Sequence, residues 1–344
     1  LAGAAHMLIF LGFGVLLLRT LILWGRGFDE SFDFWLFGSD QFLGQTYSFF
    51  KDVFAVLVPA AALVFVYFRL FARLPRLTLN REGLLILGII VAMMLADILY
   101  DGATIAGKMN TPSVFLVCEP AGSLLAQAFY GADPSTLAFL RHLGFWTHSS
   151  LVLIFLNLLP YSKHFHIITG IPNVYFQDLH PPGRLPPIED MDGKLEREET
   201  LGIRRIDQFS WKSILDFYTC TECGRCSDFC PATKTGKKLS PKHFTLDLRD
   251  FLYKHENALV AGKANGDAQE HRKDLVDGVI DPEVLWACTT CRACEQECPV
   301  FISFVDKIVD LRRYLVQERS EFPVQLQTAF RGMETNTNPW SFPS

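Results

Sequence analysis

The first half of the chain contains four long apolar stretches separated by short polar segments. They cover about residues 3–25, 48–72, 83–105 and 137–166, and each is long enough to cross a bilayer as a helix. A further apolar stretch, residues 112–129, is interrupted by Pro120 and Gly122. We expect that stretch to lie at the membrane interface. The pattern therefore predicts a transmembrane domain over residues 1–166 with four spans.

Arginine in the short loops predicts how the spans are oriented. The loop after the first stretch contains no Lys or Arg, whereas the loop after the second contains Arg69, Arg73, Arg76 and Arg81. Because positive loops stay in the cytoplasm, the second loop is expected there and the first outside. The fourth span then runs inward and ends near Lys163. Residues 167–344 are therefore expected on the cytoplasmic side of a prokaryotic inner membrane.

The second half of the chain has a different pattern. A linker is predicted over residues 167–205, where five prolines precede a charged run: Pro172, Pro181, Pro182, Pro186 and Pro187. Residues 206–320 have helical periodicity with little strand alternation, and residues 321–344 read as an extension toward missing or separate domains. The expected fold class is all-α, with a transmembrane helix bundle followed by a helical soluble domain.

Charge and composition agree with this division. Residues 1–166 hold 10 Lys+Arg and 10 Asp+Glu, against 22 and 27 in residues 167–344. The net charge of −5 gives no electrostatic footprint for nucleic acid, so no nucleic-acid partner is expected. The chain opens without Met, a basic segment or a cleavage site, and we expect residues to precede Leu1.

Eight of the nine cysteines lie in two runs of the form C-x2-C-x2-C-x3-C-P. In this pattern three thiolates surround one corner of a cubane and the fourth reaches the other cluster. One [4Fe–4S] cluster is thus expected on Cys220, Cys223, Cys226 and Cys298, and a second on Cys288, Cys291, Cys294 and Cys230. The alternative, a zinc site, normally has two C-x2-C pairs and does not explain the third and fourth Cys.

Histidines near the membrane predict a haem site. His148 and His166 are 18 residues apart, which is five helical turns, so in one continuous helix they would share a face about 27 Å apart. His164 would lie off that face, and Pro160 would kink such a helix. His6 is expected at the same cytoplasmic depth as His166. We therefore predict a b-type haem between His6 and His166, the alternative being that both are interfacial polar residues.

A second polar set is expected at the outer level of the membrane. Arg19, Asp97, Asp101 and His148 could share one site there, because ionisable residues inside a membrane are functional candidates by default. One interpretation is quinone binding with proton exchange. The other is an Arg19–Asp97 pair that only locks two helices together. His148 has no visible histidine partner in the sequence, so the sequence leaves open whether a second haem binds. Cys118 is expected to be a buried small hydrophobe.

Two segments resemble the cytochrome b (gamma) subunit of respiratory nitrate reductase. "HSSLVLIFLNLLPYSKHFHI" resembles its last transmembrane helix, with two histidines 18 apart, Pro160 between them and a Ser162–Lys163 pair. "AAHMLIFLGFGVLLLRT" resembles an earlier helix that carries two histidine ligands in that family. His6 fits the first ligand, but Leu16 occupies the second position. The resemblance thus implies the inner haem, on His6 and His166, and leaves the outer one open.

The soluble domain resembles the iron–sulfur subunit of succinate dehydrogenase and, more closely, the ferredoxin-like part of heterodisulfide reductases. The 57 residues between the cysteine runs suggest the all-helical ferredoxin variant. With "FYTCTECGRCSDFCPA" and "LSPKHFTLDLRD", the layout resembles membrane-bound iron–sulfur oxidoreductases related to heterodisulfide reductase. That family implies an electron-transfer flavoprotein partner, menaquinone, and further subunits or cysteine-rich domains.

These features predict an oxidoreductase that passes electrons between a cytoplasmic flavoprotein and the membrane quinone pool. The sequence has no Rossmann, Walker A or nucleophile-elbow motif, so flavin or nicotinamide chemistry would come from a partner. The alternative is a non-catalytic electron-transfer and anchoring subunit of a larger complex.

Overall fold

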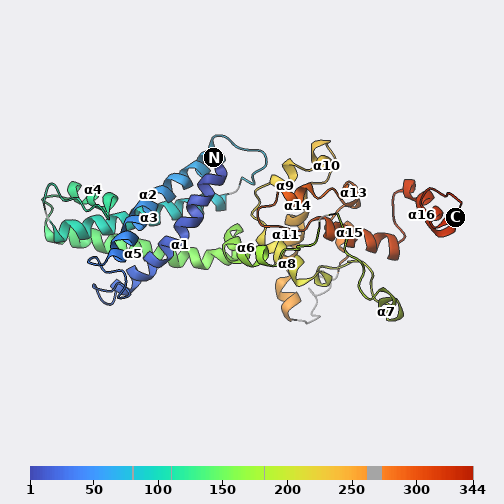
Figure 1. Ribbon diagram of the computed structural model, residues 1–344, viewed down its shortest axis with the longest axis horizontal. Coiled ribbons are helices and arrows are strands. Elements are labelled where there is room, and N and C mark those ends of the chain that lie inside the picture. The colour runs from blue at the N-terminus through green and yellow to red at the C-terminus, as the bar shows by residue number, and fades with distance from the viewer. Residues whose placement is uncertain (80, 110, 182, 262–272, 344) are drawn as a thin grey trace. The chain divides into compact units, whose positions relative to one another are not determined.

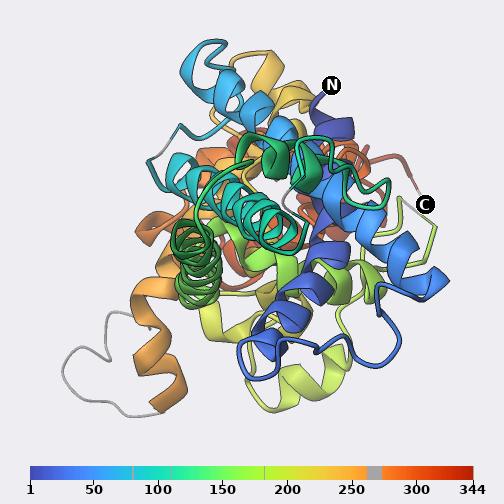
Figure 2. The same ribbon diagram turned by 90° about the vertical axis from the view of Figure 1, so that its left-hand side faces the viewer.

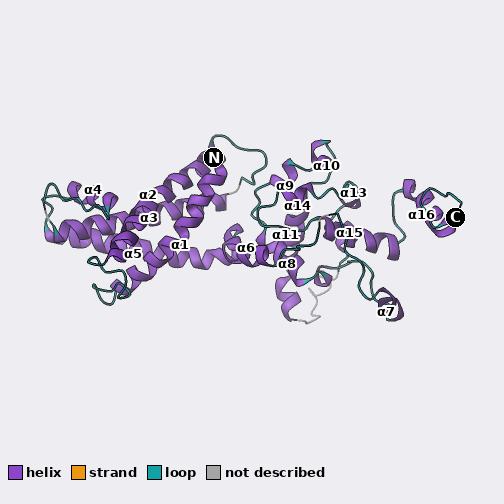
Figure 3. Ribbon diagram, in the orientation of Figure 1, coloured by secondary structure: helices purple, strands orange, loops and turns teal. Residues whose placement is uncertain are grey.

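The computed structural model describes residues 1–79, 81–109, 111–181, 183–261 and 273–343, so Pro182 of the predicted linker lies outside them. Within these ranges the regular structure is helical, apart from one isolated bridge between Val276 and Ile280 (Figure 3). The chain divides into two compact units, Leu1–Ser162 and Lys163–Ser344. The predicted all-α fold class is confirmed.

The first unit is built from four long helices and one short one (Figure 1). They are α1 (Ala2–Arg26), α2 (Phe42–Leu70), α3 (Arg81–Lys108), α4 (Pro120–Ala128) and α5 (Pro134–Leu158). All four long helices are long and apolar enough to cross a membrane. Helix α3 is central and packs against α2, α4 and α5, while α1 packs mainly on α2 (Figure 2). The short α4 occupies the stretch for which no span was predicted.

Close packing of α5 on α3 depends on a glycine. A Cβ atom at Gly144 would lie 2.7 Å from the carbonyl oxygen of Ala96 and 2.8 Å from the backbone nitrogen of Tyr100. Small residues at such contacts let two apolar helices approach closely where no hydrophobic effect drives them together. Large apolar side chains such as Phe10, Leu95 and Phe139 instead stay exposed on the outside of the unit.

The fourth apolar helix ends earlier than the sequence pattern predicts. Helix α5 stops at Leu158 and is followed by two short 3₁₀ segments, Leu159–Tyr161 and Lys163–Phe165. Pro160 lies in the first of these, where it has no N–H to continue the helical hydrogen bonds. A new helix, α6 (His166–Tyr175), then begins. The shared face assigned to His148 and His166 is therefore wrong, because no single helix carries both.

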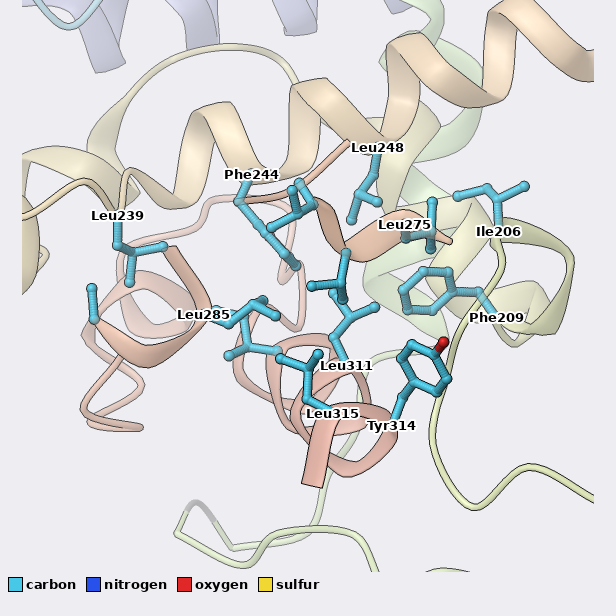
Figure 4. Close-up of a cluster of buried hydrophobic side chains, with 14 of the residues drawn as sticks. Ile206, Phe209, Leu239, Phe244, Leu248, Leu275, Leu285, Leu311, Tyr314 and Leu315 are labelled. Atoms are coloured by element: carbon cyan, nitrogen blue, oxygen red, sulfur yellow. The ribbon is translucent and has the colours of Figure 1, made fainter. Parts of the chain in front are cut away.

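The second unit consists mostly of short helices packed around two hydrophobic clusters. After α6 come α7 (Met191–Glu196), α8 (Trp211–Thr219), α9 (Arg225–Asp228), α10 (Pro231–Lys234), α11 (Pro241–Ala261), α12 (Leu275–Gly278), α13 (Pro282–Trp286), α14 (Ala293–Gln296), α15 (Val305–Arg313) and α16 (Gln327–Asn336). Figure 4 shows Phe244 and Leu248 of α11 above Leu285 and Leu311. The long segment between the cysteine runs thus supplies much of this core.

The beginning of the predicted linker is part of the second unit. Helix α6 packs on α8, with the rings of Phe176 and Trp211 5.0 Å apart. Just before α6, the rings of Phe165 and Tyr218 are 5.8 Å apart. The linker interpretation of residues 167–205 therefore fails for the first part of that range, which forms a packed helix.

The glycine contact can be tested with a matched pair of variants. Gly144→Ala should lower the free energy of unfolding of the first unit by about 1–3 kcal/mol, because its Cβ overlaps the α3 backbone. Gly88→Ala on α3 meets nothing within 4 Å and should be neutral or stabilising by up to about 1 kcal/mol. Thermal unfolding in detergent compares them. Equal stability of the two variants would contradict the close approach.

Candidate iron–sulfur centres and a membrane charge cluster

The cysteines of the two runs line two separate cavities. The first cavity is lined by Cys220, Cys223, Cys226 and Cys298, and the second by Cys230, Cys288, Cys291 and Cys294. They enclose about 300 Å³ and 320 Å³ of atom-free space respectively, part of it open to solvent. Each cavity combines three thiols of one run with the fourth thiol of the other. This is the grouping that the crossed cluster pattern predicts, and iron binding by these thiols stays a prediction.

The two cysteine loops share an unusual backbone conformation. Glu222 and Gly224 have φ of 56° and 73°, and Thr290 and Arg292 have φ of 55° and 58°. These are the same two positions after the first cysteine of each run. Only one of the four is glycine, so three residues adopt a costly left-handed conformation. Such turns direct successive backbone N–H groups toward one point, which suits a negatively charged ligand.

Backbone N–H groups do reach cysteine sulfurs. The N–H of Thr290 donates to Cys288 Sγ at 3.4 Å, and that of Ile302 donates to Cys298 Sγ at the same distance. Hydrogen bonds to the sulfurs are one of the means by which a protein tunes an iron–sulfur cluster.

Burial makes the thiols of Cys220, Cys226 and Cys298 poor acids without a metal. It raises the pKa of Cys220 and Cys226 to about 12 and that of Cys298 to about 11. The thiolate form therefore needs nearby positive charge, which bound iron would supply. Four thiols and a backbone N–H donor to one of their sulfurs fit a [4Fe–4S] cluster in each cavity.

The two cavities have different surroundings. Cys291 of the second cavity is exposed. The first cavity is lined by buried Glu222, whose carboxylate lies 2.9 Å from the guanidinium of Arg249 and 3.9 Å from the ammonium of Lys163. Lys163 is the first residue of the second unit, so the first cavity lies beside the segment that joins the fourth apolar helix.

The first unit contains a set of charges, four of them buried and Glu119 half-buried, which we call the membrane charge cluster: Arg19, Lys51, Asp97, Asp101 and Glu119. Arg19 lies 2.9 Å from Asp97 and 2.5 Å from Asp101. Lys51 lies 2.6 Å from Asp101 and 3.3 Å from Glu119. The cluster thereby joins α1, α2, α3 and the residue before α4. It contains the Arg19–Asp97 pair on which the locking interpretation rests.

Lys51 and Asp52 were missed as functional or structural candidates from the sequence. Asp52 accepts hydrogen bonds from the backbone N–H groups of Ala121 and Gly122 in the first turn of α4, at 2.5 and 3.3 Å. A Lys–Asp pair inside an apolar stretch was the available signal. Its partner, the start of α4, could not be recognised because that segment has no strong periodicity.

His148 is buried between α1 and α3. Its Nδ1 lies 3.3 Å from the carbonyl oxygen of Met93, and its Nε2 lies 3.1 Å from the hydroxyl of Thr20. Because a carbonyl only accepts, Nδ1 donates to Met93, while the hydroxyl of Thr20 also donates to the carbonyl oxygen of Leu16 at 3.1 Å. Both nitrogens thus have a polar neighbour inside the unit, and a haem-ligand role for His148 stays a prediction.

The predicted haem pair lies in different units. His6 is exposed on α1, and His166 begins α6. The Nδ1–H of His166 donates to the carbonyl of Lys163 at 2.8 Å. The pairing of the two histidines stays a prediction. Cys118 is half-buried rather than buried as expected.

Residues 212–299 match the family described as "4Fe-4S dicluster domain". The chain contains a 4Fe-4S dicluster domain. This domain includes both cysteine runs and the α11 segment between them.

The chain is similar along nearly its whole length to two curated proteins. It is 33% identical over 98% of its length to the "Probable iron-sulfur-binding oxidoreductase FadF" of Bacillus subtilis, and covers 50% of that protein. It is 32% identical over 99% of its length to the "EtfAB:quinone oxidoreductase" of Syntrophomonas wolfei, and covers 49% of it. The chain thus spans about half the length of these relatives.

A shorter match covers the dicluster region. Over 30% of its length the chain is 30% identical to one subunit of the ferredoxin:CoB-CoM heterodisulfide reductase of Methanosarcina mazei, and it covers 49% of that protein. No solved structure matches the chain. The resemblance to iron–sulfur oxidoreductases related to heterodisulfide reductase is confirmed by these matches.

The crossed ligand sets make a prediction for double variants. Cys230→Ala with Cys288→Ala removes two ligands of one cluster, so the purified chain should keep about half of its iron. Cys230→Ala with Cys226→Ala affects both clusters and should lose nearly all iron. Non-haem iron analysis measures both, with Cys118→Ala as the control that keeps all iron. Uncrossed ligand sets would reverse the two results.

The membrane charge cluster predicts unequal effects of two arginine substitutions. Arg19→Met leaves Asp97 and Asp101 without their shared buried guanidinium and should cost about 3–5 kcal/mol. Arg141→Met breaks only a pair with exposed Glu30 and should cost less than about 1 kcal/mol. Thermal unfolding in detergent compares the variants. Similar stability of the two would show that the cluster does not hold the helices together.

Proposed function

We propose that this protein is a membrane-bound electron-transfer oxidoreductase. It passes electrons between a cytoplasmic flavoprotein donor and the membrane quinone pool through two [4Fe–4S] clusters. The observation that carries the proposal is the pair of four-thiol cavities in a dicluster domain that follows four apolar helices. The names of the two long relatives, an iron-sulfur-binding oxidoreductase and an EtfAB:quinone oxidoreductase, support it.

The cavities suggest a direction of electron transfer along the domain. The second cavity has the exposed thiol Cys291, which would bring its cluster near a soluble partner at the surface. The first cavity lies beside Lys163, next to the segment that joins the fourth apolar helix. Electron transfer of this kind needs no general acid or base at the clusters. The chain's own residues would hold the iron and set the local charge.

A subunit role is the second candidate function. The chain spans about half the length of its long relatives, and its dicluster region is similar to one subunit of a heterodisulfide reductase. In this alternative the domain transfers electrons and anchors a larger complex, and substrate chemistry takes place on other domains or chains.

The proposed transfer can be tested on the full chain in membrane vesicles that contain menaquinone. A reduced electron-transfer flavoprotein should bleach the visible absorbance of the clusters, and quinol should then accumulate. Cys226→Ala lacks one ligand of the first cavity and should lower the rate of quinol formation at least about 100-fold. Bleaching without quinol would favour the subunit role, and no bleaching would contradict a flavoprotein donor.

The proposal includes one b-type haem held by His6 and His166, on the strength of the resemblance to the nitrate reductase gamma subunit. When bound, a haem would supply a further one-electron carrier on the membrane side. His6→Ala should abolish the pyridine haemochrome signal, whereas His148→Gln should leave it in place because His148 is bonded to Thr20 and Met93. A haem signal that survives His6→Ala, or is lost in His148→Gln, would overturn this assignment.

Arg19, Asp97, Asp101 and His148 remain a proposed quinone site. The ion pairs and the two hydrogen bonds of His148 favour the structural alternative, since every one of these side chains already has a partner from another helix. Thr20→Val in the vesicle assay separates the two. A changed quinone KM with unchanged thermal stability would favour a quinone site, and lower stability with an unchanged KM would favour the lock.

A further inference from the structure

A buried carboxylate lies at the centre of a hydrogen-bond network in the dicluster unit. Asp216 of α8 is fully buried. Its Oδ1 accepts from Lys212 Nζ at 2.7 Å and from Asn173 Nδ2 at 2.9 Å. Its Oδ2 accepts from Lys307 Nζ at 2.5 Å and from the backbone N–H of Ser303 at 3.3 Å. A buried charge with this many donors is fully compensated.

Asp216 is held in its charged form. Burial alone would raise the pKa of this carboxyl group, but the ammonium groups of Lys307 and Lys212 outweigh burial and lower the pKa below its usual value. Asp216 therefore carries a fixed negative charge at neutral pH.

The network is attached to the loop that carries the last cysteine of the first cavity. Val300 O accepts from Asn173 Nδ2 at 2.8 Å, and Ser303 O accepts from Lys307 Nζ at 2.5 Å. Val300 lines the first cavity with Cys298, as do the two neighbours of Ser303 in sequence. Asn173 and Lys307 thus hold this loop at two points, and both also hold Asp216.

The second cavity has a different charged environment. Its lining residue Arg292 pairs with Glu295 and Asp306 at 2.6 and 2.7 Å. Arg312 donates to the carbonyl oxygen of Cys288 at 2.5 Å. Net charge and hydrogen bonding near a cluster are levers on its reduction potential. The two cavities would therefore place chemically similar clusters in different electrostatic environments.

We infer that the Asp216–Lys307 ion pair is a positioning element that sets the reduction potential of the first-cavity cluster independently of the second. The inference rests on the proposed function, because it requires a cluster on Cys220, Cys223, Cys226 and Cys298. Asp216 disfavours an added electron on that cluster, and Lys307 favours it. The pair thereby sets the difference in reduction potential between the two clusters.

The two charges predict shifts of opposite sign. Asp216→Asn removes a negative charge and should raise the potential of the first-cavity cluster. Lys307→Gln removes a positive charge and should lower it. Each shift should be about tenfold in the one-electron reduction equilibrium, or about 59 mV. The double variant restores the charge balance, so its potential should return close to that of the native protein.

The measurement is a redox titration followed by electron paramagnetic resonance on the full chain. Cys288→Ala removes a ligand of the second cavity and so assigns the remaining signal to the first. In chains that keep Cys288, the second-cavity cluster serves as an internal control whose potential should stay unchanged. Asp207→Asn removes a negative charge from an exposed pair with Arg205 and should leave both potentials unchanged.

Each outcome decides between a charge effect and simple packing. A purely structural role predicts that both single variants shift the potential in the same direction and that the double variant is worse than either. That result, or potentials that do not move, would overturn the inference. If the single variants lose iron, the potential of the first-cavity cluster is measured instead in Lys212→Gln, which removes another positive partner of Asp216 at a partly exposed site. A lowered potential would support the inference, and an unchanged one would overturn it.

Failure of the inference differs from failure of the proposed function. A native chain with fewer than two clusters would contradict the proposed function. A native chain with both clusters and variants with unmoved potentials would contradict the inference alone.

Discussion

The dicluster unit depends on the exchange of one thiol between the two cysteine runs. Cys230 lines the second cavity and Cys298 lines the first. This exchange requires the 57 residues between the two runs to fold back so that the runs lie side by side. Helix α11 crosses the core on the way and contributes Phe244 and Leu248 to it. Because Cys220, Cys226 and Cys298 are buried and hard to ionise alone, bound iron and the core would stabilise each other.

The same constraint explains the buried charges of this unit. A cluster with four thiolates places negative charge in an apolar interior, and the protein must compensate it with oriented N–H groups and with fixed ions. The left-handed residues of the two loops provide the first, at the cost of strain at Glu222, Thr290 and Arg292. Lys307 and Arg249, each paired with a carboxylate, provide the second. The first unit follows a similar rule, since each charge of its membrane cluster has a partner on another segment.

The sequence predicted features that depend on local spacing. Apolar stretches predicted the four long helices, and the C-x2-C-x2-C-x3-C pattern predicted both thiol groups. The break at Pro160 was harder to predict, because a proline can kink a helix or end it and only the packing of α6 on α8 decides. The partners of Lys51 and Asp216 were not predictable. Ion pairs between residues 50 to 91 positions apart leave no periodic signal in one sequence.

Metal analysis of the full chain, purified without oxygen, tests the central claim most directly. Two [4Fe–4S] clusters require about eight non-haem irons and about eight acid-labile sulfides per chain. That result is expected if each cavity holds a cubane. Zinc without labile sulfide, or about four irons in total, would contradict the account.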